Sequence, residues 1–310
     1  MAPCFFTRGE RINAIDNYGD LYFCNRSRFD SRLLGAARAK GVEVLLGDRA
    51  EAVDTASRTC LLRSSRKLRY RYLVGADGAN SVVARSVTPE AFDKGRYAFA
   101  VQAEVQDWAG REQGSAKPEI HFGEVEWGYG WVFPKKNSCS IGLGGLYPKN
   151  RNIRQRFGEF YASRNSRPYE GALKGHFIPF GNYVRLAATN DIVLSDDAAG
   201  LVDPVTGEGI AHAIGSGHHA ALAVISVLSG GKAGIADAYE PYFRQVTQEI
   251  DRANMIRNFL FSECSRGLFI SALSRTRTMP NHFMDLLSGE ITYRDLFSII
   301  QQKVKKLFFW

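Results

Sequence analysis

The spacing of apolar residues predicts a helix, a strand and a second strand in the first quarter of the chain. Leu33 and Ala37 recur at helical spacing, and Gly41 then ends the helix. The Val-Glu-Val-Leu-Leu run at 42–46 is typical of a strand. Residues 60–72 read as a basic hairpin leading into the apolar strand at 71–75, which stops abruptly in a Gly-Ala-Asp-Gly-Ala-Asn turn cluster.

The pattern changes after residue 96, where short alternating runs with turn residues between them predict an antiparallel sheet. Helical spacing returns towards the C-terminus. The expected elements there are a polar helix at 151–164, a short apolar strand at 193–194, a long helix at 210–228, a second helix at 237–261 and a helical remainder to residue 310.

Strand–helix–strand units at both ends, with an antiparallel sheet between them, predict an α/β fold that is α+β overall. In this arrangement a partial Rossmann-like domain is split in sequence by an antiparallel-sheet insert. The chain then ends in a helical region.

Composition narrows the classes of protein that fit this pattern. The chain has 310 residues, enough for about two domains, and its 45% hydrophobic and 23% charged residues are those of a globular protein. The net charge of +8 is spread rather than gathered in one tract, which argues against nucleic acid as a partner. This surplus fits an anionic small ligand or an anionic membrane surface.

The cysteines and the apolar runs set expectations for metal sites and location. None of the five cysteines shows a Cys-x-x-Cys spacing, so neither a metal site nor a disulfide framework is expected. The start of the chain has no signal-peptide pattern, and the best apolar run, at 220–228, is far shorter than a membrane span. We expect a cytoplasmic protein, soluble or membrane-associated at its periphery.

The first candidate for chemistry is the turn cluster at 75–81. A buried strand that ends here leaves the Asp77 carboxylate and the bare backbone of Gly78 at the carboxyl edge of a sheet, where α/β proteins bind ligands. A plain turn with an Asx hydrogen bond explains the same residues equally well.

The second candidate is the cluster at 196–210, which follows an apolar strand and opens a helix. Asp197 can accept hydrogen bonds from ligand hydroxyls such as those of a sugar-alcohol chain. Gly207 and Gly209 let backbone N–H groups at the helix start, near Ile210, point at an electron-rich group. A well-capped helix with a glycine-rich entry is the alternative, and it is less favoured.

The third candidate is an aromatic strand. Tyr129, Trp131 and Phe133 share one face and are followed by Pro134. Three large rings on one face form a core or line an apolar cavity, and the pattern alone favours a core.

Five motifs in order resemble the geranylgeranyl reductase family of FAD-dependent oxidoreductases, within the glutathione-reductase/p-hydroxybenzoate-hydroxylase type of flavoprotein. The resemblance runs from about Asn25 to the end. The motifs are Arg-Ser-Arg-Phe-Asp at 26–30, Gly-Ala-Asp-Gly-Ala-Asn-Ser at 75–81, Gly-Tyr-Gly-Trp-Val-Phe-Pro-Lys at 128–135, the segment at 196–210 and Ser-Gly-Glu-Ile-Thr-Tyr-Arg-Asp-Leu at 288–296.

The resemblance implies a role for each matching position. Arg26 would contact the phosphates of FAD, and Ala50 would lie by the adenine. Asp197 would bind the ribityl chain, and Gly209 with Ile210 would lie against the pyrimidine end of the isoalloxazine. The remaining matches complete the implied set: Asp77, Gly78 and Gly207 for the cofactor, and Tyr129, Trp131, Phe133 and Pro134 for an isoprenoid cavity.

Two departures from the family stand out. The family's strand–GxGxxG–helix segment, which holds the ADP half of FAD, has no counterpart here, since Gly142-Leu-Gly144-Gly145 lacks the last glycine. In addition, Asp196 stands where the family's Gly-Asp-Ala-Ala-Gly motif begins with glycine. It places a second carboxylate close to a pyrophosphate, and we expect this to weaken FAD binding.

The resemblance therefore implies an FAD-dependent oxidoreductase that reduces carbon–carbon double bonds of an isoprenoid or other apolar substrate, with NAD(P)H or another reductant as electron donor. It identifies no proton donor or other catalytic residue. A flavin-dependent monooxygenase of the same fold and a non-catalytic remnant that binds a ligand or a partner are the alternatives.

The implied domains are a first FAD-binding part at 1–95, a substrate-binding sheet at 96–185, a second FAD-binding part at 186–232 and a helical region at 233–310. The basic and aromatic tail, which ends in Phe308, Phe309 and Trp310, either contacts anionic lipid or forms an ordinary amphipathic helix.

Overall fold

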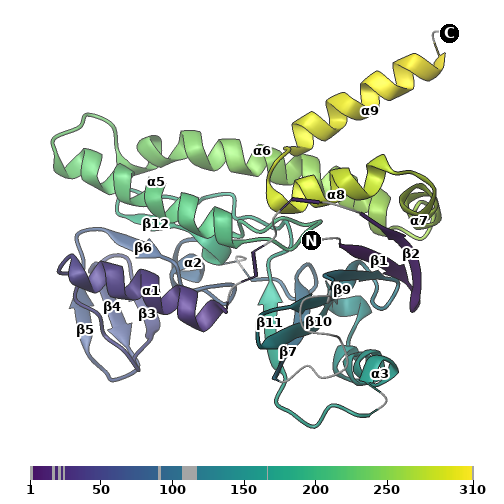
Figure 1. The fold of residues 1–310 in the computed structure, drawn as a ribbon. Helices are drawn as coiled ribbons and strands as arrows, with labels where there is room; N and C mark the ends of the chain where they lie inside the picture. The colour runs from purple at the N-terminus through teal and green to yellow at the C-terminus, as the bar shows by residue number, and fades with distance from the viewer. Residues whose placement is uncertain are drawn as a thin grey trace.

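The computed structural model describes residues 3–15, 18–19, 22–23, 25–89, 92–106, 117–165 and 167–308 (Figure 1). It contains a seven-stranded sheet, a two-stranded parallel sheet, a three-stranded antiparallel sheet and helices around them. This mixed architecture confirms the fold class expected from the sequence. Of the five cysteines, Cys24 lies outside the described residues and the other four are free thiols.

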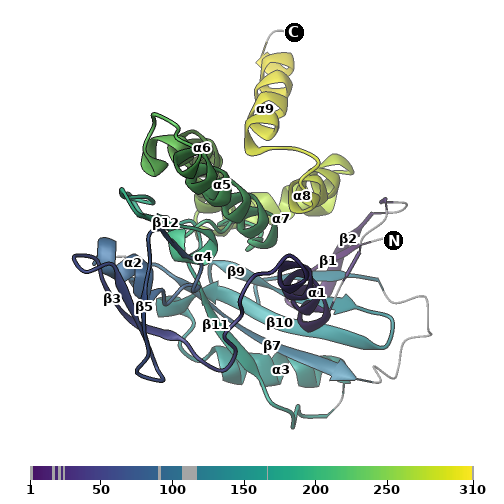
Figure 2. The ribbon, with the colours of Figure 1, turned by 90° about the vertical axis from the view of Figure 1, so that its left-hand side faces the viewer.

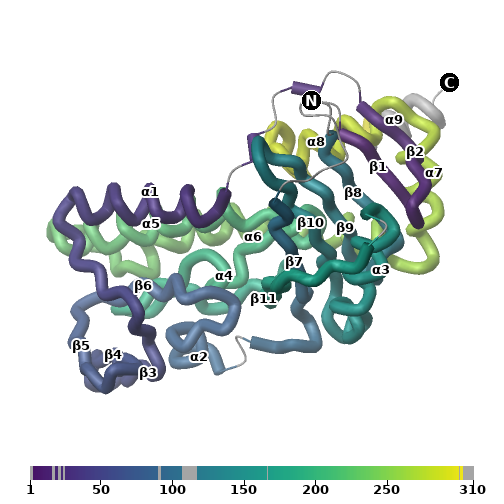
Figure 3. Tube along the Cα trace, turned by 60° about the horizontal axis from the view of Figure 1, so that its bottom comes forward, coloured from purple at the N-terminus to yellow at the C-terminus, as the bar shows by residue number. Residues whose placement is uncertain are grey.

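The large sheet contains the antiparallel strands that the alternating runs predict. Its order is β11 (Lys174–Ile178), β7 (Ala98–Gln106), β10 (Ser138–Leu146), β9 (Gly128–Pro134), β8 (Glu119–Phe122), β1 (Cys4–Thr7) and β2 (Glu10–Ala14). All neighbours are antiparallel except β1 and β8. Figure 3 shows the N-terminal hairpin beside β8, so residues 4–14 join a sheet that the sequence analysis places at 96–185. The predicted domain boundaries stay predictions.

Helices cover both faces of this sheet (Figure 2). On one face lies α3 (Ile153–Asn165), preceded by the short 3-10 helix η1 (Tyr147–Lys149). It buries Ile153, Phe157, Phe160 and Tyr161 because they recur at helical spacing on one side. On the other face α7 (Arg266–Arg275) and α8 (Thr278–Ser288) supply Phe269 and Phe283 to a core with Phe122.

The second half of the molecule is built on a parallel pair of strands. β6 (Leu73–Gly75) pairs with β12 (Ile192–Leu194), and the antiparallel strands β3 (Ala50–Asp54), β4 (Thr59–Leu62) and β5 (Lys67–Arg69) form a separate sheet. The short helices α2 (Val82–Val87) and α4 (Asp196–Ala199) follow the parallel strands. A Cβ at Gly75 would lie 2.8 Å from Val83, so only glycine lets β6 and α2 approach this closely.

The predicted strand at 42–46 is wrong. The helix before it is confirmed as α1 (Arg26–Ala39), and Gly41 follows it with a left-handed φ of 86°. Residues 42–46, however, belong to no strand, and Val42 and Leu46 are 54% and 67% exposed. A strand requires a hydrogen-bonded neighbour, and in the described part of the chain β6 has only β12 beside it. An apolar pattern without a neighbouring strand therefore forms no ladder, and its side chains stay exposed.

Helices α5 (Ile210–Leu228) and α6 (Ile235–Phe261) pack against each other along one side of α5. The opposite side of α5 carries Ile214, Leu222, Ile225 and Leu228, each about half exposed. Among the described residues α5 is also the one helix that is long and apolar enough to cross a membrane, and little of it is buried. This exposed apolar side of α5 and the exposed residues 42–46 are called the open apolar surfaces below.

The helical C-terminus is confirmed, and it ends in α9 (Tyr293–Phe308), which projects from the rest of the fold in Figures 1 and 2. Phe309 and Trp310 lie outside the described residues, as does the side chain of Phe308. The contact of this tail with anionic lipid therefore stays a prediction.

The glycines of β10 serve the aromatic strand rather than a phosphate. The indole of Trp131 lies across β10 so closely that a Cβ at Gly142 would stand 2.2 Å from its Cζ2 atom, and one at Gly144 would stand 3.5 Å from its Cζ3 atom. Trp131 Nε1 also lies 3.4 Å from Ser140 Oγ on the same strand. The glycine run thus provides a flat floor for this ring.

We expect Gly142→Ala to destabilise the fold by ~2 kcal/mol, because the added methyl forces the indole off its floor. Urea unfolding of purified protein measures the change. Gly158→Ala is the matched control, since no atom lies within 4 Å of a Cβ built at this position on α3, and it should be neutral or slightly stabilising. Equal stability of the two variants would contradict the packing argument.

Candidate flavin site

The parallel pairing of β6 with β12 brings both turn clusters to one sheet edge. Gly75 and Leu194 are register partners, and Ser195 N donates to Gly75 O at 2.9 Å. The clusters at 75–81 and 196–210 therefore begin side by side, at the carboxyl ends of parallel strands. This edge is where open α/β sheets bind ligands.

In the first cluster, the Asp77 carboxylate is engaged by the protein itself. It accepts hydrogen bonds from Val82 N at 2.7 Å, from Val83 N at 3.3 Å and from the Ser81 hydroxyl. These bonds cap the N-terminus of α2, which is the turn interpretation of this motif. A role for Asp77 and Gly78 in binding a cofactor stays a prediction.

In the second cluster the backbone turns within a few residues. Gly200 has a left-handed φ of 77°, and a Cβ there would lie 2.3 Å from Asn182 O, so the position requires glycine. Asp196 also has a positive φ, of 58°, which a residue with a side chain adopts only at a cost. The departure from the family's glycine at Asp196 therefore introduces strain as well as charge.

The Asp197 side chain is the chemical centre of this cluster. Its carboxylate is half-buried and accepts no hydrogen bond from the residues that the structure describes. Burial, reinforced by the neighbouring Asp196, raises the pKa of Asp197 to about 7, and Arg26 opposes this rise. Burial raises the pKa of Asp196 as well, again against Arg26. The positive charge of Arg26, at the start of α1, thus acts on both carboxylates, while its Nε pairs with Asp30 Oδ1 at 3.1 Å. Its contact with the phosphates of FAD stays a prediction.

The N-terminus of α5 adjoins Asp197. A Cβ at Gly209 would lie 3.7 Å from Asp197 Oδ1, and one at Gly207 would lie 3.8 Å from the hydroxyl of Tyr129. Glu208 Oε1 accepts the N–H of Ala211 at 2.8 Å and so caps one donor of the helix. Within the described chain, the N–H groups of Ile210 and His212 have no acceptor, so they remain available to a ligand.

Hydrogen bonds to the Asp203 carboxylate hold the loop between Asp197 and α5 in place, and the sequence analysis did not predict them. Asp203 Oδ1 accepts the N–H groups of Val205 and Thr206 at 2.7 and 2.8 Å, and also the hydroxyl of Tyr293 at 2.9 Å. Tyr293 belongs to the late motif at 288–296, which was the one signal for it. The Tyr129 hydroxyl donates to Thr206 O, so the same loop is tied to the aromatic strand.

The aromatic residues of β9 share one face, as the alternation predicts. Tyr129, Trp131 and Phe133 are half-buried, while Gly130 and Val132 between them are buried towards α3. The face meets the core below α7 and α8 only in part. It can therefore both pack and present rings to a ligand. Pro134 ends the strand opposite Cys139.

Ala50 lies apart from the second cluster. It opens β3 and pairs with Leu62 beside a bulge in the three-stranded sheet. Its contact with adenine stays a prediction. Among the described residues there is no group of three or more His, Cys, Asp or Glu side chains that could hold a metal ion.

Comparisons with known proteins show that this fold is shared with reductase-like and flavin-dependent proteins of known structure. A geranylgeranyl bacteriochlorophyll reductase-like protein of Thermoplasma acidophilum has the same fold, with a TM-score of 0.74, 19% identity and coverage of 89% of this chain and 75% of its own. The flavin-dependent brominase Bmp2 also shares it, with a TM-score of 0.65, 16% identity and coverage of 97% and 82%.

Two relatives found by sequence are both reductases of geranylgeranyl compounds. A digeranylgeranylglycerophospholipid reductase of Methanosarcina acetivorans is 26% identical in an alignment 257 positions long that covers 76% of this chain and 62% of the relative. A geranylgeranyl diphosphate reductase of Rhodobacter capsulatus is 29% identical in an alignment 221 positions long that covers 67% of this chain and 55% of the relative. No protein-family model matches the chain. The chain is thus related to the geranylgeranyl reductases, which confirms the resemblance predicted from its motifs, and it spans about three fifths of the length of these relatives.

We expect Asp197→Asn to change how stability depends on pH. The folded-state pKa of about 7 lies above the ordinary value of 3.8, so the folded protein holds a proton that the unfolded chain releases. The wild type should therefore lose stability as the pH rises from about 4 to about 7, and the variant should not. Because the carboxylate is half-exposed, we expect a relative gain of only ~1–2 kcal/mol for the variant at pH 8.

Urea unfolding at pH 4.5 and pH 8 measures this difference. Asp237→Asn, at an exposed position on α6, is the control and should follow the wild type at both pH values. Parallel curves for Asp197→Asn and the wild type would show that the environment of Asp197 is not as described.

Asp196→Gly should stabilise the protein by ~1 kcal/mol, because glycine adopts the positive φ without strain. Removal of the neighbouring carboxylate should also lower the pKa of Asp197. Ser65→Gly relieves a similar φ of 66° in a turn far along the chain and controls for strain alone. Thermal unfolding gives the stability change, and only Asp196→Gly should shift the pH dependence described for Asp197.

Proposed function

We propose that this chain carries the flavin and substrate sites of an FAD-dependent reductase that saturates carbon–carbon double bonds of an isoprenoid or similar apolar lipid. The observation that carries the proposal is the unpartnered Asp197 carboxylate beside the bare N-terminus of α5. Through Thr206, the loop between them is tied to the aromatic strand β9. A polar cofactor end and an apolar substrate face therefore meet at one place.

The residues present fit the flavin end of FAD. Asp197 has a carboxylate free to accept ribityl hydroxyls, and Ile210 and His212 have N–H groups free to meet the pyrimidine edge. Gly207 and Gly209 leave room for a flat ring at close range. The ADP half has fewer counterparts here, namely Arg26 and Ala50.

A bound flavin supplies the hydride in reactions of this class. This chain's own residues contribute orientation and charge. The positive end of the α5 dipole, at Ile210, would stabilise negative charge on a flavin held there. Tyr129 keeps its proton, because burial raises the pKa of its hydroxyl. The hydroxyl donates a hydrogen bond to Thr206 O. Tyr129 therefore holds the loop in place rather than supplying a proton.

The substrate class rests on the names of the relatives and on β9. Trp131 and Phe133 present half-buried rings from a rigid strand, a surface that excludes water around an alkyl chain. We further propose that NAD(P)H or another reductant reduces the flavin, and that the protein works in the cytoplasm with a peripheral membrane contact where its lipid substrate lies.

To test the proposed reductase activity, the full chain is incubated without oxygen with FAD, dithionite and a geranylgeranyl lipid. The mass of the lipid is then measured by mass spectrometry. We expect the lipid to gain two hydrogens for each double bond reduced. Bound flavin with unchanged lipid would contradict the reductase and leave a flavoprotein. Addition of an oxygen atom only in air would indicate the monooxygenase alternative.

Asp197→Ala should retain at least ~tenfold less flavin after gel filtration, because it loses charge-assisted hydrogen bonds. The matched control is Asp237→Ala, which removes an exposed carboxylate from α6. Equal retention of flavin by the two variants would contradict the assignment of Asp197.

A further inference from the structure

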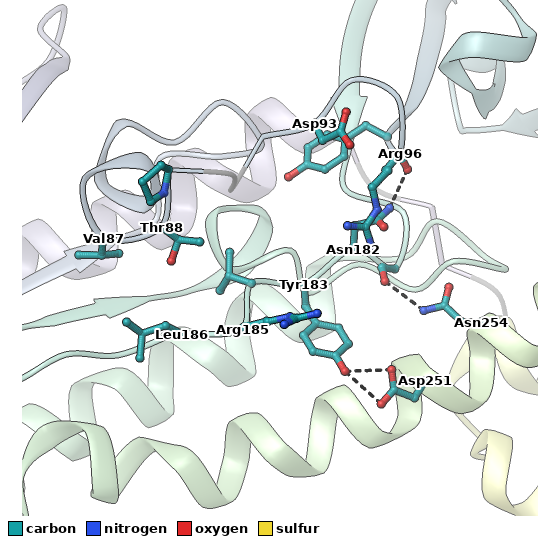
Figure 4. A pocket seen from close by; sticks show the side chains of 14 residues that line it. Val87, Thr88, Asp93, Arg96, Asn182, Tyr183, Arg185, Leu186, Asp251 and Asn254 are labelled. Atoms are coloured by element: carbon teal, nitrogen blue, oxygen red, sulfur yellow. Dashed lines mark hydrogen bonds between the residues drawn. The ribbon is translucent and has the colours of Figure 1, made fainter.

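A cavity lies beside the loop that follows Asp197. Its volume is about 840 Å³, and it opens where the segment 181–186 passes between residues 87–89 and 93–97 on one side and helix α6 on the other (Figure 4). Gly181 N donates to Val202 O and Val184 N donates to Ala199 O, so the floor of the cavity is bonded directly to that loop. None of the residues implied for FAD or the isoprenoid lines it.

The floor of this cavity is built rigidly. Asn182 Nδ2 donates to Arg96 O at 2.6 Å and to Pro179 O at 2.7 Å, which ties the segment to the connection above it. Phe180 and Gly181 both have left-handed φ values, and Asn254 Nδ2 on α6 holds Gly181 O at 3.0 Å. A strained backbone that several bonds over-determine is typical of a ligand site.

Charged side chains of both signs surround the cavity. Arg96 and Arg185 are exposed at the rim, and neither has an ion-pair partner within the described part of the chain. Arg257 lies behind the floor, where its Nη1 donates to Phe180 O at 2.7 Å, while its Nε is buried without a partner. Burial and the nearby Arg96 lower the pKa of Arg257, so three arginines place positive charge around this cavity.

Acceptors and rings complete the lining. Asp93 stands beside Arg96, and Asp251 receives the Tyr183 hydroxyl at 2.9 and 3.0 Å (Figure 4). Tyr183 is half-buried, and Val87 and Leu186 form an apolar lip. Two further polar atoms of the lining, Thr88 Oγ1 and Asn254 Oδ1, are buried without partners. The lining thus combines two carboxylates, a phenol ring and an apolar lip with the arginines at the rim.

We propose that this cavity binds the ADP moiety of a dinucleotide. Arg96 and Arg185 hold the two phosphates as charge-assisted hydrogen-bond donors. Asp93 and Asp251 accept the ribose hydroxyls, the pairing that carboxylates make in dinucleotide-binding folds. The base packs on Tyr183 and the apolar lip. A prenyl diphosphate would leave the carboxylates facing its phosphates, and the mixed charge therefore favours a nucleotide.

Calorimetry with ADP on the full chain tests the proposal. We expect ADP to bind, inorganic pyrophosphate to bind more weakly, and Arg96→Gln and Arg185→Gln each to weaken ADP binding roughly tenfold. Arg63→Gln, which removes an equal charge from an exposed position between β4 and β5, should bind ADP like the wild type. Thermal unfolding of each variant confirms that these exposed substitutions leave the fold intact.

Competition experiments identify which dinucleotide supplies the ADP moiety. NADH, NADPH and FAD are each titrated against ADP, and at least one should displace it from the wild type. Displacement in the Asp197→Ala variant as well would show that the cavity acts independently of the proposed flavin site. No ADP binding, pyrophosphate binding as tight as that of ADP, equal affinity in both arginine variants, or failure of all three dinucleotides to compete would overturn the proposal.

Discussion

The parallel ladder between β6 and β12 is the constraint on which the site depends. It has only three register pairs, yet it aligns the ends of two segments that lie more than a hundred residues apart in the sequence. The ladder is short enough that Gly75 must lack a side chain for α2 and β12 to close around it. If this pairing were lost, the Asp77 turn and the Asp197 turn would separate, and neither turn alone forms a site.

The Asp196–Asp197 pair combines desolvated charge with backbone strain at this edge of the sheet. Two neighbouring carboxylates are held half out of water, one of them on a backbone that glycine would occupy more easily. Arg26 offsets part of the repulsion, but it approaches from an exposed helix with no buried residue of its own. The pair is therefore poised to respond to any ligand that brings hydroxyl donors or positive charge, which a fully compensated carboxylate would not be.

Local patterns predicted local structure well. The helix at 210–228 was predicted with the bounds it has, because a glycine-rich entry and an apolar run mark both ends. The strand at 42–46 was wrong, because a strand depends on a neighbour that periodicity cannot supply. The hairpin of β1 and β2 was missed for the related reason that its pairing with β8 is distant in sequence. In the site, motifs single out Arg26 and Asp197 as candidates. The late motif includes Tyr293, but its bond to Asp203 joins residues 90 apart, and no local pattern predicts such a pairing.

The open apolar surfaces should make the self-association of this chain depend on temperature. Ile214, Ile225, Leu228, Val42 and Leu46 all meet water over about half of their surface or more. The attraction between such surfaces grows on warming, whereas the folded core resists until its own transition. Molecules of this chain should consequently cluster on gentle heating while each is still folded, and disperse again when cooled.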